Sequence, residues 1–193
     1  DNKFTGPRPV SVNSKTYSVG QPTVSPDGKV LIFASDKPGG YGGTDLYFCT
    51  KKGNDWSNAK NLGPAINTKG DELYPSMSPE GVLFFASNYH PGFGGFDIFK
   101  SSRVDQYWPH PENLGMPVNS SQDDYALIMR NGVGYFTSNR AGGQGSDDIY
   151  QVTQMATLSK IYVYDTDIKP IYKARVTFIE SPNMQVICET DAS

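Results

Sequence analysis

Three aspartates recur at nearly constant spacing, each at the end of a glycine-rich stretch. Asp45 and Asp97 are 52 residues apart, and Asp97 and Asp148 are 51 apart. A carboxylate beside such a loop could bind calcium together with backbone carbonyls, and Asp36 at the start of the first loop could be a second ligand. Alternatively, each carboxylate accepts hydrogen bonds from N–H groups of its own loop and holds the turn. Because the residue recurs in every copy, we favour the structural role for all three.

The sequence offers no catalytic set. Its only histidines are His90 and His110, so a histidine metal site lacks ligands. No Ser/His/Asp arrangement has a motif behind it. A phosphate-binding loop needs a helix after its glycines, whereas a strand-like apolar run, residues 46–48 in the first copy, follows here. We therefore expect no catalytic residue, no cofactor and no bound metal.

The glycine-rich stretches belong to a longer repeat. In each copy a short strand and a turn precede an apolar strand, the glycine-rich loop follows, and a further strand leads away from it. Trp56 and Trp108, 52 residues apart, introduce an outer strand that the third copy lacks. Four short strands in about 50 residues are typical of one β-propeller blade. We expect the two tryptophans at equivalent buried or part-buried positions of neighbouring blades.

The repeat also predicts the domain organisation of an all-β chain. Residues 1–153 are expected to form three β-propeller blades at the C-terminal end of a propeller, of six in total. Residues 154–193 contain three stretches of alternating apolar and polar residues and are expected to begin a β-sandwich. A propeller closes with about 4–8 blades, so we expect the chain to be part of a longer polypeptide. The third blade should then pair with a strand from outside its own copy.

Composition narrows the classes of partner. The 193 residues carry a formal net charge of -3, so electrostatics favour neither nucleic acid nor an anionic membrane surface. No apolar run approaches the roughly 18 residues of a membrane-spanning helix. The two cysteines, Cys49 and Cys188, are compatible with a buried free thiol or with a disulfide.

The side chains that vary between otherwise constant loops are the candidates for partner binding. Rigid loops with varied tips along one rim are how propellers commonly present a binding face. Tyr, Phe and Arg are also favoured at the centres of protein interfaces. The alternative is that Tyr41 and Phe93 fold back over their own loops. By the repeat spacing, one set of equivalent positions is Lys37, Tyr89 and Arg140, and another is Tyr41, Phe93 and Gln144, with His90 beside them.

Four motifs of the repeat resemble a known family. In the first copy they are residues 25–28 (SPDG), 34–36 (ASD), 42–47 (GGTDLY) and 61–63 (NLG). They resemble the WD-like propeller repeats of TolB type, in the version found in Gram-negative envelope proteins with a C-terminal OmpA-like peptidoglycan-binding domain. This resemblance covers roughly residues 12–153.

The tail extends the resemblance. Residues 170–178 (PIYKARVTF), followed by 189–191 (ETD), are similar to the start of a carboxypeptidase-regulatory-like β-sandwich. A propeller followed by this sandwich resembles the PorE family of type IX secretion components, which are outer-membrane-associated lipoproteins. In that family a helical repeat region precedes the propeller and the OmpA-like domain follows the sandwich.

The resemblance implies a non-enzymatic scaffold for protein contacts in the periplasm, associated with the outer membrane and with type IX secretion. Its partners would be other cell-envelope or secretion-system proteins, and peptidoglycan would be reached only through a flanking domain outside this sequence. Two alternatives stay open. A glycan- or peptide-processing propeller enzyme would need acids converging at one end of a central channel. A calcium-stabilised adhesion module would lose thermal stability in the presence of a chelator.

Overall fold

The computed structural model describes residues 3–105, 107–154, 175–180 and 184–189, the last two ranges by their backbone alone. The chain divides into two compact units, Asp1–Met155 and Ala156–Ser193. The described residues form strands, turns and loops, and no helix long and apolar enough to cross a membrane occurs among them. The all-β fold class predicted from the sequence is confirmed.

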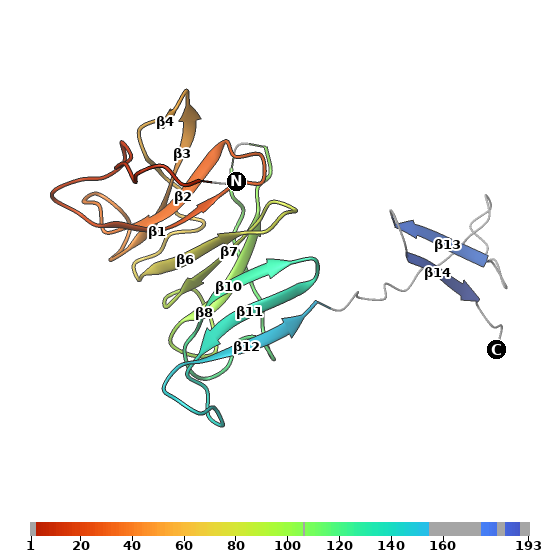
Figure 1. Cartoon of the computed structure of the whole chain (residues 1–193). Helices are drawn as coiled ribbons and strands as arrows, with labels where there is room; N and C mark the ends of the chain where they lie inside the picture. Colours follow the sequence, from red (N-terminus) through yellow and green to blue (C-terminus); the bar gives the residue numbers. More distant parts are fainter. Residues whose placement is uncertain (1–2, 106, 155–174, 181–183, 190–193) are drawn as a thin grey trace. The chain divides into compact units, whose positions relative to one another are not determined.

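The first unit consists of three antiparallel sheets that follow one another along the chain (Figure 1). We call them the first, second and third blades. In each blade the second strand is the apolar run of the repeat, and in the first two blades this strand is buried on both faces. The first blade comprises β1 (Val19–Val24), β2 (Val30–Ser35), β3 (Asp45–Lys52), β4 (Asp55–Trp56) and β5 (Lys60–Asn61). The second comprises β6 (Glu72–Met77), β7 (Val82–Ser87), β8 (Asp97–Ser102) and β9 (Glu112–Asn113), and the third β10 (Asp124–Arg130), β11 (Val133–Ser138) and β12 (Asp148–Thr153).

The register of the central hairpin is the same in every blade. Each glycine-rich loop joins the second strand to the third, and a Ser–Asp pair closes the loop where the two strands meet. We call residues 36–44, 88–96 and 139–147 the first, second and third glycine loops. The closing pairs are Ser35 with Asp45, Ser87 with Asp97 and Ser138 with Asp148.

The outer strands are shorter than the sequence predicts. A single strand was expected over residues 56–63, but β4 and β5 are separate and pair with different parts of β3. In the second blade only Glu112–Asn113 pairs with β8, and Trp108 lies outside the strands. Pro109 and Pro111 lack the N–H groups that a longer strand would need. Within the described residues, the third blade has three strands.

The inner strands carry a repeated irregularity. In β1, β6 and β10 the register shifts at a residue with positive φ, which is Gln21 (52°), Tyr74 (53°) and Ala126 (58°) respectively. The irregularity lets neighbouring inner strands touch. The Gln21 side chain accepts a hydrogen bond from Tyr74 N (2.6 Å), and the rings of Tyr74 and Tyr125 stack with centroids 4.9 Å apart.

The hydrophobic core lies between the blades. Each blade buries one sheet face against the next, which is how repeat architectures stabilise their units. The cluster between the first and second blades contains Ile32, Ala34, Leu46, Leu62, Ile66, Leu83, Phe85 and Phe99. The cluster between the second and third blades contains Phe84, Ile98, Leu127 and Phe136. A third cluster, on the face of the first blade that points away from the second, contains Val12, Leu31, Phe33, Tyr47 and Cys49.

Both tryptophans are part-buried at equivalent places, as predicted. Trp56 packs against the cluster on the face of the first blade that points away from the second. Trp108 packs against the cluster between the first and second blades. Cys49 is a buried free thiol in the described part of the chain, and burial raises its pKa to about 11. The side chain of Cys188 lies outside the described residues, so the disulfide alternative stays untested.

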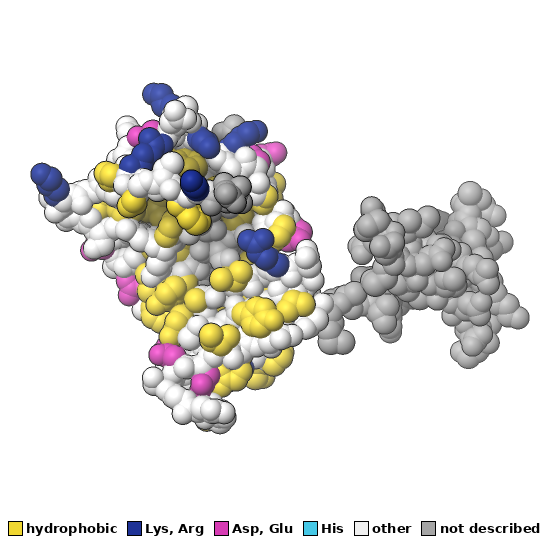
Figure 2. Space-filling model, in the orientation of Figure 1, with side chains coloured by type: hydrophobic (Ala, Val, Ile, Leu, Met, Phe, Trp, Pro, Cys, Tyr) yellow, Lys and Arg dark blue, Asp and Glu magenta, His cyan; other side chains and the backbone are white. Residues whose placement is uncertain are grey.

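The third blade exposes the face that the other blades bury. Tyr135 and Ile149 are 50% and 78% exposed, whereas Phe84 and Ile98 at the equivalent positions of the second blade are buried. Figure 2 shows hydrophobic side chains gathered over β10–β12, while Lys and Arg side chains gather mainly over the first blade.

The second unit is described by one hairpin. Strands β13 (Arg175–Glu180) and β14 (Met184–Glu189) pair antiparallel in continuous register. Strands were expected over residues 160–165, 169–179 and 185–190, and of these residues the structure describes only 175–179 and 185–189. The β-sandwich therefore stays a prediction.

Candidate functional site

The three repeated aspartates hold the glycine loops by accepting hydrogen bonds from the N–H groups of these loops. Asp45 is 1% exposed and accepts hydrogen bonds from Tyr41 N (2.7 Å) and Gly42 N (3.2 Å) of its own loop. Its Oδ2 atom also accepts one from the Asn61 side chain (2.8 Å). The same loop bonds recur in the other two blades, and they are the hydrogen bonds expected for a structural turn. They run to Asp97 from Phe93 N (2.8 Å) and Gly94 N (3.0 Å), and to Asp148 from Gln144 N (2.8 Å) and Gly145 N (3.3 Å).

In each loop the aspartate carboxylate leaves no room for a side chain at one position, which is why that position is a glycine. A Cβ added at Gly40 would lie 2.2 Å from the nearest carboxylate oxygen of Asp45. The corresponding distances at Gly92 and Gly143 are 2.0 and 1.9 Å. These separations are far below van der Waals contact, so the loop can close over its carboxylate only where a side chain is missing.

The first two loops are also fixed to the following blade. Thr44 N donates to the Asp71 carboxylate (2.8 Å), and Phe96 N donates to that of Asp123 (2.8 Å). A Cβ at Gly42 would lie 2.2 Å from the Gly70 carbonyl oxygen, so this loop also depends on a glycine for its packing. Because both ends of each loop are bonded to the blades, its tip is a rigid platform.

The carboxylates are occupied by N–H donors and are poor candidates for calcium ligands. Asp36 accepts a hydrogen bond from Ser18 N (2.6 Å), and Asp45 accepts the three described above. A cation at these oxygens would face the same partial positive charges, unless the hydrogen bonds were broken. Within the described ranges, no group of three or more His, Cys, Asp or Glu side chains could hold a metal ion. The geometry favours the structural interpretation.

Three of the predicted loop-tip residues point back into the blades. Each places a basic or imidazole group against the aromatic ring that the third strand of its blade carries at the same position. The Lys37 amino group lies 5.7 Å from the Tyr47 ring centroid. The His90 ring lies 5.1 Å from the Phe99 ring, and the Arg140 guanidinium 4.9 Å from the Tyr150 ring.

Arg140 is the most firmly held of the three. Its guanidinium forms an ion pair with Asp124 at 2.6 Å and donates to the carbonyls of Pro117 and Val118. His90 Nε2 lies 2.8 Å from the carbonyl oxygen of Ile66, which is the counterpart of Val118 in the preceding blade. His90 therefore takes the place in the second blade that Arg140 takes in the third. The repeat spacing predicted Tyr89 for that place, but the shorter histidine side chain reaches it from one residue later.

The remaining loop-tip residues face outward. Tyr41, Tyr89 and Phe93 are 49%, 58% and 52% exposed, and Gln144 is exposed at the third loop. The backbone N–H groups of Tyr41, Phe93 and Gln144 are the ones bonded to the aspartates, so their side chains start from fixed positions. We call Tyr41, Tyr89, Phe93 and Gln144 the loop rim.

Two structural residues had no assigned role in the sequence. Asn67 and Asn119, 52 residues apart, are 2% and 1% exposed. Asn67 accepts from Leu46 N (2.8 Å) and donates to the Leu46 carbonyl (2.9 Å), and Asn119 makes the same pair of bonds to Ile98. They extend the ladder of the third strand with an amide side chain. Their regular spacing was the only available signal.

Glu72 is a buried acid whose pKa is raised because burial disfavours the charged form. Its carboxylate accepts hydrogen bonds from Thr68 N (2.8 Å), Thr68 Oγ1 (2.5 Å) and Ser87 Oγ (2.8 Å), which partly offset the effect of burial. A raised pKa can mark a catalytic acid. Glu72 is 0% exposed, however, and all three hydrogen bonds hold one blade together, so the geometry assigns it a structural role.

Comparison with known proteins gives low similarities. No protein-family model matches the chain, and no curated protein matches it in sequence. Among solved structures, TolB from Acinetobacter baumannii has a TM-score of 0.46 and 14% identity over 89% of this chain and 41% of that one. A puromycin-hydrolyzing peptidase from Mycobacterium tuberculosis has a TM-score of 0.45 and 12% identity over 76% and 29%. A puromycin hydrolase mutant has a TM-score of 0.42 and 10% identity over 88% and 33%.

The chain thus spans 29% to 41% of the length of these solved structures. The architecture described above rests on the three sheets of this chain and their repeated register.

Proposed function

We propose that this chain is a non-enzymatic protein-interaction module whose contact surface is the loop rim. The observation that carries the proposal is the pairing of exposed aromatic side chains with a fixed backbone. Tyr41 and Phe93 are about half exposed, while their own N–H groups are bonded to buried carboxylates. Aromatic side chains on rigid supports bind with little loss of conformational entropy, which is why they dominate many protein interfaces.

The chemistry of the acids supports a binding role over catalysis. Asp45 and Asp97 face N–H donors, and Asp124 is paired with Arg140. Glu72 is fully buried among hydrogen-bond donors. Each of these carboxylates therefore already has a structural task, and none of them is presented to a substrate.

The proposed setting is the bacterial cell envelope. The sequence motifs resemble TolB-type repeats, and the order of propeller and sandwich resembles PorE of type IX secretion. On that resemblance we propose a periplasmic location associated with the outer membrane, with secretion-system or other envelope proteins as partners. The secretion role rests on the motifs alone.

A capture experiment with rim variants tests the proposal. The chain, fused to an affinity tag, is incubated with envelope extract as wild type, as the Tyr41→Ser/Phe93→Ser double variant, and as Tyr107→Ser. Tyr107 is 58% exposed but lies between β8 and β9, away from the rim. We expect a protein retained by wild type and by Tyr107→Ser to be lost with the double variant.

Two results would count against the proposal. One is a set of captured proteins that is unchanged in the double variant. The other is hydrolysis of peptide or glycan substrates by the purified chain, with a pH dependence that an active-site acid would produce.

A further inference from the structure

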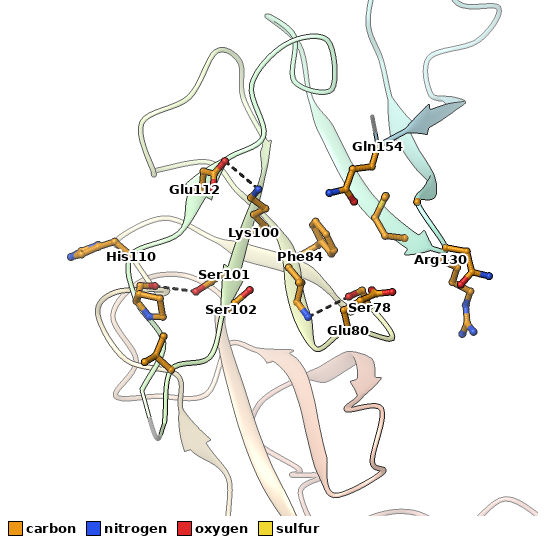
Figure 3. Close-up of a pocket in the computed structure, with 16 residues that line it drawn as sticks. Ser78, Glu80, Phe84, Lys100, Ser101, Ser102, His110, Glu112, Arg130 and Gln154 are labelled. Atoms are coloured by element: carbon orange, nitrogen blue, oxygen red, sulfur yellow. Dashed lines mark hydrogen bonds and ion pairs between the residues drawn. The ribbon is translucent and has the colours of Figure 1, made fainter. Parts of the chain in front are cut away.

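A groove between the second and third blades is open to a ligand. It encloses a cavity of about 540 Å³. Its walls are Val82, Phe84 and Lys100 of the second blade and Met129 of the third, with Gln154 at its edge. Figure 3 shows Phe84 directed toward the space between the two blades, whereas the Lys100 side chain runs toward Glu112, with which it forms an ion pair at 3.2 Å.

The equivalent groove between the first and second blades shows what such a groove accepts. There Trp108 packs against the inter-blade core and lines a cavity of about 280 Å³ together with Val30 and Phe48. Val30 and Phe48 are the counterparts, 52 residues earlier, of Val82 and Lys100. In the first groove, therefore, an indole from an extended, proline-flanked segment covers the edge of the core.

The described residues supply no such indole to the second groove. The residues packed against its core are Val82, Leu114, Val118, Met129, Tyr150 and Val152, and the sequence has no third tryptophan. Lys100 replaces Phe48, so one wall changes from aromatic to cationic with an aliphatic stem. The Lys100 ammonium is paired with Glu112, so the aliphatic stem is the part of this side chain that can pack on apolar groups.

We propose that the groove between the second and third blades binds a tryptophan side chain on an extended segment of a partner protein. The indole takes the place that Trp108 takes one blade earlier, between Val82 and Met129 and against Lys100. Met129 is an adaptable wall for such a ligand, since its side chain is flexible and polarizable.

This site is separate from the loop rim. Val82 pairs with Ser102, whereas the second glycine loop follows Ser87 at the other end of the same strand. The groove and the rim therefore lie at opposite ends of the second blade, and either one could bind without the other. Failure of the groove proposal leaves the rim proposal standing.

The test uses a fluorinated peptide and the whole chain. The probe is a synthetic peptide with the sequence of residues 104–112, in which 5-fluorotryptophan replaces the tryptophan. Its fluorine NMR signal reports the probe alone, despite the two tryptophans of the protein. We expect the signal to shift and broaden with added wild-type chain, and Lys100→Phe, which restores the aromatic wall, to bind about tenfold more tightly.

Two tryptophan substitutions at equivalent positions provide the matched control. Ser102 lines the groove and is exposed, so Ser102→Trp should fill it and abolish the shift. Thr50 is the exposed counterpart in the first blade, and Thr50→Trp should leave the shift unchanged. No shift with folded wild-type chain would overturn the proposal, as would equal binding by the Ser102→Trp and Thr50→Trp variants.

Discussion

The carboxylates of Asp45 and Asp97 both hold a glycine loop, but they differ in how many of their oxygens accept hydrogen bonds. Asp45 receives donors on both oxygens, whereas Asp97 Oδ1 is buried without a hydrogen-bond partner among the described residues. In the second blade the Asn113 side chain donates to the Pro91 carbonyl instead (3.3 Å). The repeat thus preserves the residue while its hydrogen bonding varies from blade to blade.

This difference predicts unequal costs for the same substitution. An Asn at position 45 must turn its NH2 group toward an N–H donor, whereas at position 97 it can place that group at the unpartnered site. We expect Asp45→Asn to lower the free energy of unfolding by about 1–3 kcal/mol, and Asp97→Asn by clearly less. Urea unfolding of both variants measures the difference, and equal or reversed costs would contradict the assignment.

Glu72 predicts a pH dependence of stability. Because its pKa is raised on folding, the folded chain holds the proton more tightly, and the resulting stability is present at low pH and lost as the pH rises through the folded pKa. The Glu72→Gln variant cannot titrate there. From about pH 4 to about pH 7, the free energy of unfolding of wild type should therefore fall relative to that of the variant. A difference that is constant with pH, or that has the opposite slope, would show that Glu72 does not cause this pH dependence of the free energy of unfolding.

Among the elements, the first and second glycine loops join one blade to the next. The second loop is tightly packed, because a Cβ at Gly94 would lie 2.0 Å from the Gln122 carbonyl oxygen. At Gly145, the equivalent position of the third loop, the nearest atom is 3.6 Å away. The same residue type therefore meets two different environments.

Alanine substitution should separate the two loops. Gly94→Ala forces backbone apart at a blade junction and should lower the thermal midpoint by several degrees, as expected for a loss of about 2 kcal/mol or more. Gly145→Ala should change the midpoint by less than about 2 °C. Calorimetry measures the thermal midpoints of both variants. Similar midpoints would mean that the second loop does not join the blades as described.

The sequence predicted the blades well because every blade repeats the same local chemistry. The SPDG-type turn and the apolar run predicted β2 and β7, and the Asp after the glycines marked the start of β3 and β8. The outer strands were predicted less well, since Pro109 and Pro111 interrupt the pairing. The positions of His90 and Arg140 depend on ring packing and a long-range ion pair, which spacing alone does not encode.

At the scale of the whole first unit, each blade face is complementary to the next blade. Ile98 is 1% exposed because the third blade covers it, whereas Ile149 at the equivalent place on the third blade is 78% exposed. Burial, rather than residue type, therefore determines what each isoleucine contributes to stability. Full burial of one such side chain stabilises by about 1.5–3 kcal/mol.

A charge at these two positions should have opposite consequences. Ile98→Lys buries an ammonium in the core between the second and third blades and should prevent stable folding. Ile149→Lys places the ammonium in solvent, so it should leave the thermal midpoint nearly unchanged and reduce self-association. Calorimetry and light scattering of the soluble fractions test both expectations. A strongly destabilised Ile149→Lys variant would contradict the exposed face of the third blade.

We propose that the loop rim binds a protein partner. Site-specific photo-crosslinking tests it most directly, with a benzophenone amino acid placed at Tyr41, Phe93 or, as the control, Tyr107 in cells that produce the protein. We expect positions 41 and 93 to capture the same envelope protein and position 107 not to capture it. The absence of any adduct from both rim positions, or the same adduct from position 107, would contradict it.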